Sequence, residues 1–514
     1  MERYFLGIDI GTFESRGILI DESFRVAADA SVPHGMDNPQ PGWFEQDAEA
    51  VWWGDLCKLC RTLIKQSEIR PEQIACVGTS ALGTDCLPVD EQCRPLRPAI
   101  LYGIDARASE EAAWLTEHYG QARVQELFGH PICSGDTATK ILWLRRHEPE
   151  IYAKTAYFLT GSSFLTARLT GKYVIDQSLA KGSFRPLYQA DGSVNEAECG
   201  LYCRPDQIAA CAWSTDIVGT VTPEAAAQTG LAAGTPVIAG TGDSTAEAIS
   251  VGLVEPGTAF FQYGSSMFYY YCTDRFVGSY VSPQGNGTLK GGKAFTVPGT
   301  YCLGDGTNAA GTLTRWVRDL LYSKELDAEK QGGENAYAVM AREAAAVPPG
   351  SDGLIMLPYI YGERSPLQDA EATGMLFGLK GTHGRAQINR AALEAVGYST
   401  YQHLLLFEEL GVPPRRIITA GGGTKNAAWM QIICDMAGMP LTIPEPFQCS
   451  SYGDAMLAAL GVGALESFAA LRAALPQGRI LQPDRKNHEF YQEHYPIFRD
   501  LYLENRDRMH KMQK

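Results

Sequence analysis

The stretch YFLGIDIGTFESRGILI (residues 4–20) decides the fold. Two apolar runs flank a polar turn, Gly11–Arg16, and this pattern predicts a strand, a turn and a second strand. The stretch TAFFQYGSSMFYYYC (residues 258–272) repeats the plan, with Tyr263–Ser266 at the turn. Two such hairpins far apart in one chain, each turning on glycine and hydroxyl residues, suggest two halves built alike.

Strands and helices alternate along the rest of the chain. Apolar periodicity predicts helices over 43–66, 108–128, 139–170, 307–322, 334–346, 385–410 and 426–438, and strands over 72–78, 84–90, 235–239, 354–361 and 416–420. This alternation predicts an α/β protein. We place an N-terminal domain at 1–250, a C-terminal domain at 251–486 and a helical tail at 487–514.

Composition narrows the class of protein. A chain of 514 residues is too long for one hydrophobic core. Its net charge of −15 argues against nucleic acid or an anionic membrane as a partner. The chain has neither a membrane-spanning apolar run nor a signal-peptide pattern at its start, so we expect a cytoplasmic protein. Of the 13 cysteines, Cys57 and Cys60 have a CxxC spacing but lie among apolar residues at helical spacing, which favours buried thiols.

One acid stands among glycines and small hydroxyl residues in GTGDSTAEA (residues 240–248). This residue, Asp243, directly follows an apolar run that reads as a buried strand. An aspartate in this position is typical of a helix N-cap. It is equally typical of a carboxylate at the carboxyl end of a strand, where open α/β sheets bind their ligands. The local sequence leaves both interpretations open.

The first turn has the residues of a phosphate site. Gly11 permits close approach of the backbone, Thr12 and Ser15 supply hydroxyl donors, and Arg16 supplies a cation. Asp9, two residues before the glycine, is suited to holding Mg²⁺ through water. An ordinary tight hairpin with a surface acid would have the same sequence pattern.

A second glycine-rich stretch, IITAGGGTKN (residues 417–426), runs from an apolar strand through three glycines into a predicted helix. Backbone N–H groups at such a junction suit a nucleotide. The dinucleotide-binding fingerprint does not fit, because Asn426 stands at the third glycine position. The phosphate-binding loop GxxxxGK[ST] is also absent from the sequence, so any nucleotide is bound in another way.

Taken together, these segments resemble the FGGY carbohydrate kinases, within the superfamily of sugar kinases, actin and heat-shock chaperones. The resemblance covers nearly the whole chain in order. Its segments are Asp9–Arg16, Gly42–Asp47, Ala99–Arg107, Gly240–Ala246, Tyr263–Ser266, Pro358–Pro366 and Gly421–Asn426. In the sugar region, Ser80–Leu87 lacks the Met-His pair of well-studied xylulokinases, although it is closer to pentulose kinases than to glycerol kinases.

The resemblance implies a fold and an activity. The fold would be the two-domain, actin-like and ribonuclease H-like fold of the sugar kinases, with duplicated halves and a cleft between them. The activity would be ATP-dependent phosphorylation of a primary hydroxyl of a small sugar, a keto-pentose such as xylulose. Two alternatives are a kinase of another polyol (a hexulose, ribitol or glycerol) and a non-catalytic nucleotide-binding protein. The partners would be the sugar and ATP, and a homodimer is compatible with this class.

The resemblance also implies roles for single residues. Asp243 would be the catalytic base and, with Asp9, would lie at the Mg²⁺. The nucleotide would be bound by Gly11, Thr12, Ser15, Arg16, Gly264, Ser265, Gly306, Gly422, Gly423 and Asn426. The sugar would be bound by Thr84, Asp105, Arg107 and Asp243. For Asp105 an ion pair with Arg107 is the alternative, Glu14 is expected to point away from phosphate, and His383 is interpreted as a structural loop residue.

Overall fold

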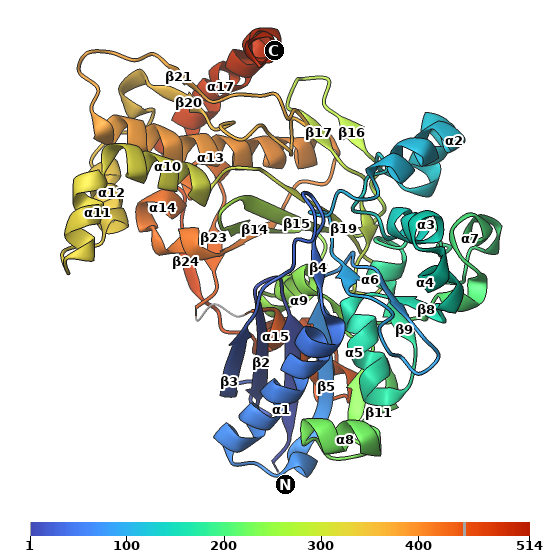
Figure 1. Ribbon diagram of the computed structural model, residues 1–514. Helices are drawn as coiled ribbons and strands as arrows, with labels where there is room; N and C mark the ends of the chain where they lie inside the picture. The colour runs from blue at the N-terminus through green and yellow to red at the C-terminus, as the bar shows by residue number, and fades with distance from the viewer. Residues whose placement is uncertain (1, 446–448, 514) are drawn as a thin grey trace. The chain divides into compact units, whose positions relative to one another are not determined.

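The computed structural model describes residues 2–445 and 449–513 (Figure 1). The chain forms two compact units that are discontinuous in sequence. Unit 1 comprises Met1–Val254, Lys293–Tyr301 and Gln448–Leu475, and unit 2 comprises Glu255–Gly292, Cys302–Phe447 and Pro476–Lys514. The predicted domains 1–250 and 251–486 were continuous, whereas in the structure the segment that ends at Leu475 belongs to unit 1. No helix of the described chain is long and apolar enough to cross a membrane.

Unit 1 is built on a seven-stranded sheet with the order β11-β12-β5-β1-β2-β3, in which β13 also pairs with β5. Its strands are β1 (Tyr4–Ile10), β2 (Glu14–Ile20), β3 (Val26–Pro33), β5 (Ile74–Ala81), β11 (Ile217–Thr220), β12 (Pro236–Ile238) and β13 (Thr241–Gly242). Strand β1 is antiparallel to β2 and parallel to β5. Asp9 pairs with Ser80, and Ser80 pairs with Thr241, so the carboxyl ends of β1, β5 and β13 meet at one edge.

Two helices cover opposite faces of this sheet. Helix α1 (Gly54–Ser67) packs against β2 and β3, where Leu59 and Leu63 approach Gly17. Helix α15 (Ser450–Gly461) packs against β1 and β5 on the other face. Each helix meets a different set of side chains, because successive residues of a strand point to opposite faces of the sheet. A Cβ atom on Gly7 would lie 1.8 Å from the Ser451 carbonyl oxygen, so glycine is required for this approach of helix to sheet.

The predicted helix 139–170 is wrong as one element. The structure has α3 (Thr137–His147), α4 (Pro149–Lys154), β8 (Tyr157–Leu159) and α5 (Gly161–Thr170). Pro149 opens a new helix, where its missing N–H costs no hydrogen bond. Strand β8 pairs with β6 (Leu87–Val89) and buries two of its three side chains. An apolar run this short has no periodicity that separates strand from helix.

The rest of unit 1 consists of short elements and α2. They are β4 (Glu45–Gln46), a π-helix (Ala48–Trp53), β7 (Ala99–Ile100), α2 (Ser109–Leu127), β9 (Val174–Asp176), α6 (Gln177–Ala180), α7 (Glu196–Tyr202), β10 (Ala210–Ala212), α8 (Pro223–Thr229), α9 (Asp243–Ser250), β18 (Lys293–Ala294) and α16 (Phe468–Ala474). Cys57 and Cys60 are buried on α1, as predicted, and burial raises the pKa of Cys57 to about 11.

Unit 2 repeats the strand plan of unit 1. The strands β19 (Tyr301–Gly306), β15 (Met267–Thr273), β14 (Thr258–Tyr263), β22 (Arg416–Ala420), β23 (Leu441–Ile443) and β24 (Arg479–Leu481) lie side by side in this order. Strand β14 is antiparallel to β15 and parallel to β22, as β1 is to β2 and β5. The duplication predicted from the two hairpins is therefore confirmed.

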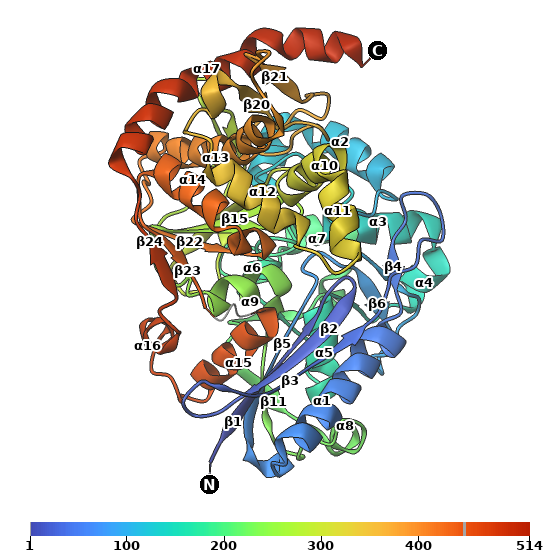
Figure 2. The same cartoon turned by 90° about the vertical axis from the view of Figure 1, so that its left-hand side faces the viewer.

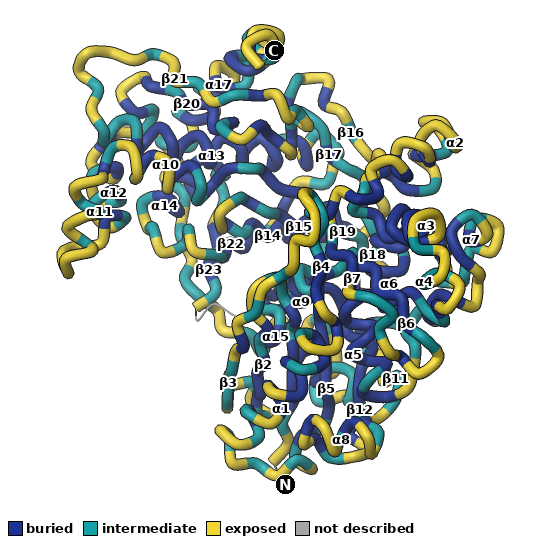
Figure 3. Tube along the Cα trace, in the orientation of Figure 1, coloured by how far each residue is buried: buried dark blue, intermediate teal, exposed yellow. Residues whose placement is uncertain are grey.

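Six helices and four short strands complete unit 2. They are α10 (Gly311–Leu321), α11 (Ser323–Lys330), α12 (Ala336–Ala345), α13 (Arg385–Glu409), α14 (Ala427–Ala437) and α17 (Arg485–Met512), with the short strands β16 (Tyr280–Val281), β17 (Thr288–Leu289), β20 (Ile355–Leu357) and β21 (Met375–Phe377). The sequence predicted all of these helices except α11, whose eight residues are all at least partly exposed. Helix α17 packs on α14 (Figure 2), and most of α13 is buried (Figure 3).

Candidate active site

Carboxylates gather at the edge of the first sheet where β1, β5 and β13 end. Ser80 connects two of them, because its Oγ lies 2.8 Å from Asp9 Oδ1 and 2.6 Å from Asp454 Oδ2. Burial raises the pKa of Asp9 to about 7, and the nearby charge of Asp243 adds to this effect. Hydrogen bonds with Ser80 and Ser450 act in the opposite direction. The edge is therefore strongly acidic and would be stabilised by a cation.

Asp243 is the first residue of α9, and Gly242 occupies the N-cap position. The side chain is half-buried, and its Oδ1 accepts hydrogen bonds from the Ser244 N–H (2.6 Å) and the Ser244 hydroxyl (3.0 Å). Burial raises the pKa of Asp243, while the Ser244 bonds and the Lys293 charge oppose the rise. The N-cap interpretation is therefore wrong, and the carboxylate stands at the strand end that the other interpretation requires.

The first turn holds most of its predicted residues at the surface. The Gly11 N–H donates to the Glu14 carbonyl oxygen (3.1 Å), and the Thr12 hydroxyl lies 3.2 Å from the Tyr102 hydroxyl. Arg16 makes a partly exposed ion pair with Asp29 at 3.4 Å, a separation that leaves its guanidinium loosely held. Glu14 is exposed.

Ser15 requires a correction. Strand β2 begins at Glu14, so the alternation of the strand turns Ser15 toward the core rather than leaving it in the turn. Its hydroxyl is fully buried and donates to Asp55 Oδ2 (2.8 Å). The side chain is therefore unavailable as the phosphate donor that the sequence predicted.

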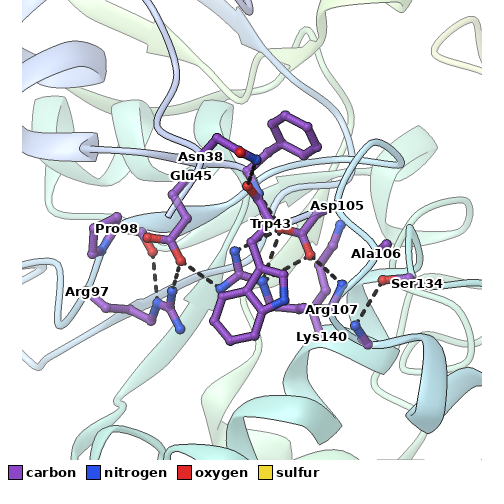
Figure 4. A network of polar contacts seen from close by, with 12 residues as sticks. Asn38, Trp43, Glu45, Arg97, Pro98, Asp105, Ala106, Arg107, Ser134 and Lys140 are labelled. Atoms are coloured by element: carbon purple, nitrogen blue, oxygen red, sulfur yellow. Dashed lines mark hydrogen bonds and ion pairs between the residues drawn. The ribbon is translucent and has the colours of Figure 1, made fainter. Parts of the chain in front are cut away.

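Asp105 and Arg107 lie in a buried network of ion pairs (Figure 4). Asp105 Oδ2 accepts from the Phe44 N–H (2.7 Å) and from Arg107 (2.8 Å), and Asp105 Oδ1 accepts from the Arg107 Nε (3.0 Å). The guanidinium also bonds Glu45 (2.7 Å) and stacks 4.4 Å from the centre of the Trp43 ring. Both side chains of the Asp105–Arg107 pair are fully buried. The ion-pair alternative is thus confirmed, and a direct contact with sugar stays a prediction.

Thr84 lies half-buried beside two buried ionisable side chains that the sequence analysis missed. Its carbonyl oxygen accepts a hydrogen bond from the Lys140 ammonium (2.7 Å), which reaches over from α3. The adjacent Asp85 is fully buried. Burial raises its pKa well above the usual range for aspartate, and the Lys140 charge counteracts this rise. No local pattern marks Lys140, because a single lysine in a helical stretch ordinarily reads as a solvent-exposed residue, whereas the structure buries every residue from Thr137 to Leu144.

Unit 2 contains a cavity of about 460 Å³, a volume within the range of small-molecule sites. Five predicted nucleotide-binding residues line it, namely Gly264, Ser265, Gly422, Gly423 and Asn426. Arg315 and Lys425 add positive charge to its wall, while Leu393 and Trp429 add apolar surface. The combination suits a flat, apolar base joined to anionic phosphates.

Loop geometry shapes this cavity. The carbonyl oxygen of Gly264 accepts from the Gly311 N–H (3.0 Å), which joins the second hairpin turn to the start of α10. Gly421 has φ +92°, and a Cβ atom there would lie 2.6 Å from the Tyr263 carbonyl oxygen. Asn426 caps α14 by accepting from the Trp429 N–H (3.0 Å). The side chain of Asn426 therefore has a structural role as well as a place in the wall.

Gly306 does not line the cavity. It is buried at the end of β19, where a Cβ atom would lie 2.3 Å from the Met267 carbonyl oxygen. Its own carbonyl oxygen accepts from Arg364 (2.8 Å). The structure thus explains this glycine by close packing. His383 is also structural, since its Nδ1 accepts a hydrogen bond from the Lys380 N–H of its own loop (3.2 Å) and its Nε2 lies 3.3 Å from the carbonyl oxygen of Asp352, 31 residues earlier in the chain.

Comparison with known proteins identifies the family to which this chain belongs. The N-terminal domain model of the FGGY family of carbohydrate kinases matches residues 4–250, and the C-terminal domain model matches residues 263–462. The chain belongs to the FGGY family of carbohydrate kinases. It is therefore a sugar kinase, and the family implies ATP as a substrate together with a divalent metal ion.

Three relatives illustrate the likeness. The chain is 30% identical to a xylulose kinase of Escherichia coli over 97% of this chain and 98% of the relative. It is 28% identical to a gluconokinase of Bacillus subtilis over 98% and 96% of the two chains. The crystal structure of xylulose kinase from Rhodospirillum rubrum has a TM-score of 0.88 at 28% identity, covering 99% of this chain and 100% of that one.

Proposed function

We propose that the enzyme transfers the γ-phosphoryl group of ATP to a primary hydroxyl of a keto-pentose such as xylulose. The observation that carries the proposal is the position of Asp243, a half-buried carboxylate at the end of β13, beside Asp9. The names of two relatives, the xylulose kinases of Escherichia coli and Rhodospirillum rubrum, support the choice of sugar. A base at Asp243 argues against a non-catalytic nucleotide-binding protein, which has no use for one.

Asp243 acts as the general base in this proposal. It accepts the proton of the sugar hydroxyl as the hydroxyl oxygen attacks phosphorus. A carboxylate whose pKa is raised toward neutrality accepts a proton more readily, and burial acts on Asp243 in this direction. Its Ser244 hydrogen bonds fix the orientation of the carboxylate before substrate arrives. Of the proposed sugar contacts, Thr84 and Asp243 are partly exposed, whereas Asp105 and Arg107 are buried.

The acidic edge of the first sheet is suited to Mg²⁺ because this ion needs few ligands from the protein. Among the residues that the structure describes, no group of three or more His, Cys, Asp or Glu side chains could hold a metal ion. Mg²⁺ commonly takes one or two carboxylates together with waters and substrate phosphates, and Asp9 with Asp243 supplies two mutually repelling carboxylates. When bound, the ion would neutralise charge on the phosphates.

In this proposal the two units contact different parts of ATP. The cavity of unit 2 binds the adenosine part, with Gly422 and Gly423 presenting backbone to the nucleotide and Ser265 presenting a hydroxyl. In unit 1, Gly11, Thr12 and Arg16 contact the phosphates. Phosphoryl transfer depends on positioning and charge stabilisation rather than on covalent chemistry from the protein.

The test is an ADP-release assay over a panel of acceptors: xylulose, ribulose, fructose, ribitol, glycerol and gluconate. We expect the highest kcat/KM with a keto-pentose, and the Asp243→Asn variant serves as the control for contaminating kinases. A higher kcat/KM with gluconate or with a polyol would show that the proposed substrate is wrong. ATP binding without turnover on any acceptor would contradict the proposed phosphoryl transfer and favour a nucleotide-binding protein. The cytoplasmic location and the homodimer stay predictions.

A further inference from the structure

Lys140 lies on α3 with its side chain fully buried, which is rare for a lysine. Its ammonium donates hydrogen bonds to the carbonyl oxygens of Thr84 (2.7 Å) and Gly135 (3.0 Å). These two carbonyl groups belong to loops that are far apart in sequence, residues 82–85 and 133–136. One buried side chain therefore ties two separate loops together through their backbones.

The loop of residues 82–85 lies next to the proposed base. A Cβ atom on Gly242, the residue before Asp243, would lie 3.6 Å from the Cα atom of Gly83, which is ordinary van der Waals contact. The same loop carries Thr84, one of the proposed sugar contacts. A shift of this loop would therefore change the distance between Thr84 and Asp243.

The loop of residues 133–136 touches the segment that leads to Asp105. A Cβ atom on Gly135 would lie 3.0 Å from the Cα atom of Gly103, so the two backbones are in direct contact. The Lys140 ammonium thus holds a loop that packs on the Asp105 segment and a loop that packs beside the base. Every proposed sugar contact in unit 1 lies in these segments or directly after them.

Asp85 supplies the countercharge for this buried ammonium. Lys140 is the strongest charge acting on Asp85, and Asp85 is the strongest charge acting on Lys140. No side chain that the structure describes donates a hydrogen bond to the Asp85 carboxylate. The contribution of Asp85 is therefore electrostatic, whereas the printed hydrogen bonds of Lys140 go to backbone carbonyl groups.

We propose that Lys140 is a positioning residue for the sugar site of unit 1, and that its ammonium fixes the spacing of the loops 82–85 and 133–136. Without this donor, two buried carbonyl oxygens would lose their hydrogen bonds, a loss that favours movement of both loops. Lys140 acts through the backbone and needs no contact with the sugar itself. The consequence for the sugar rests on the proposed function, whereas the joining of the loops does not.

Hydrogen exchange tests the joining of the loops without any ligand. Lys140→Met keeps a long unbranched side chain and removes the donor. Amide hydrogens of residues 82–85 and 133–136 should then exchange about tenfold faster than in the wild type. Lys58→Met changes an exposed lysine of α1 and is the matched control, which should exchange as the wild type does. Unchanged exchange of both loops in a folded Lys140→Met protein overturns the proposal.

Kinetics test the consequence for the sugar. Lys140→Met should lower kcat/KM for xylulose about 10- to 100-fold, because small displacements of substrate-positioning groups have effects of this size. The KM for ATP should stay within about twofold of the wild type, since the cavity proposed for the adenosine part lies in unit 2. Equal losses for sugar and ATP would indicate general damage to the fold and overturn the proposal.

Variants of Asp85 separate this role from that of an ordinary buried ion pair. Asp85→Asn leaves both hydrogen bonds of Lys140 in place and should retain kcat/KM for xylulose within about threefold. The double variant Lys140→Met/Asp85→Asn contains no unpaired buried charge, so its Tm should return toward that of the wild type. Its kcat/KM should stay as low as that of Lys140→Met. Recovery of kcat/KM in the double variant overturns the proposal.

The wild-type protein gives a further readout if Lys140→Met does not fold. Xylulose added without nucleotide should slow the exchange of both loops together, because one ammonium couples them. Protection of one loop alone overturns the proposal. A protein that binds and phosphorylates no acceptor of the panel counts against the proposed function alone, since the ligand-free exchange of the double variant still tests whether Lys140 joins the loops.

Discussion

The two hairpins have the same strand plan and opposite chemistry. In unit 1 the β1–β2 hairpin has Asp9 where β1 meets its neighbour β5, and two further acids lie near. In unit 2 the β14–β15 hairpin has Gln262 near its turn, and the adjoining loops carry Gly311, Gly422 and Gly423. The same backbone frame thus presents carboxylates in one unit and bare peptide groups in the other. The comparison shows that the two units share their strand arrangement, while a few side chains at the strand ends determine the chemical role of each unit.

The largest effect should come from removing the base of unit 1. Asp243→Asn should lower kcat by roughly 10²-fold or more, because a general base typically contributes that much. Nucleotide affinity should stay nearly unchanged, since the cavity proposed for the adenosine part lies in unit 2 and Asp243 does not line it. Steady-state kinetics and nucleotide titration check both, with the exposed Asp206→Asn as the matched control. A loss smaller than tenfold in a folded variant would assign the base to another residue.

Substitutions at two adjacent glycines, Gly422 and Gly423, test whether unit 2 binds the nucleotide. A Cβ atom on Gly423 would lie 2.8 Å from Tyr263 Cβ and 2.9 Å from Trp429, whereas a Cβ atom on Gly422 would meet nothing within 4 Å. Gly423→Ala should therefore lower the free energy of unfolding by about 1–3 kcal/mol. Gly422→Ala should leave stability unchanged and raise the ATP KM about tenfold, because its methyl group points into the space proposed for the nucleotide. Thermal unfolding and kinetics of both variants are required, and an unaltered ATP KM in Gly422→Ala would contradict the proposed nucleotide site.

The two units should respond to pH in opposite ways. Asp9 has a pKa of about 7 in the fold against 3.8 in its unperturbed state, so between about pH 4 and pH 7 the folded protein binds more protons and loses stability as pH rises. Buried His403 of unit 2 has a pKa of about 4 against 6.5, so over about pH 4–6.5 it makes the protein more stable as pH rises. Asp9→Asn should flatten the first slope and His403→Gln the second, with Tm differences of about 2–4 °C. Metal-free thermal unfolding across this range measures both, and parallel slopes in the two variants would refute the assignment.

The smallest effect concerns the acid inside the first turn. Glu14 is exposed, and its charge is solvated in the folded protein. Glu14→Gln should therefore change the ATP KM less than twofold. A gain in ATP affinity of tenfold would show that the side chain faces the phosphates and repels them. Arg16→Ala gives the contrasting variant at the same turn, because it removes a cation proposed to contact the phosphates.

The sequence predicted what depends on neighbours in the chain. The two hairpins, most helices and the strand-end position of Asp243 follow from local patterns of apolar residues and glycines. The contact between Ser80 and Asp454 joins residues 374 positions apart, and nothing near Asp454 in sequence marks it as part of a site. Ser15 was misplaced because one residue at the start of β2 decides which face of the sheet it joins. The buried ion pairs around Arg107 likewise depend on three separate segments meeting.

The glycine contacts of α15 determine when unit 1 can finish folding during synthesis. Helix α15 covers the face of β1 and β5 that carries Gly7 and Gly78, and it packs on α9 so closely that a Cβ atom on Gly453 would lie 1.9 Å from the Ala246 carbonyl oxygen. The ribosome makes these strands first and α15 only after most of unit 2. Until then the glycine face of the sheet has no cover, and exposed apolar surface of this kind invites association with other chains. The part of the protein that is synthesised first is therefore among the last to be completed.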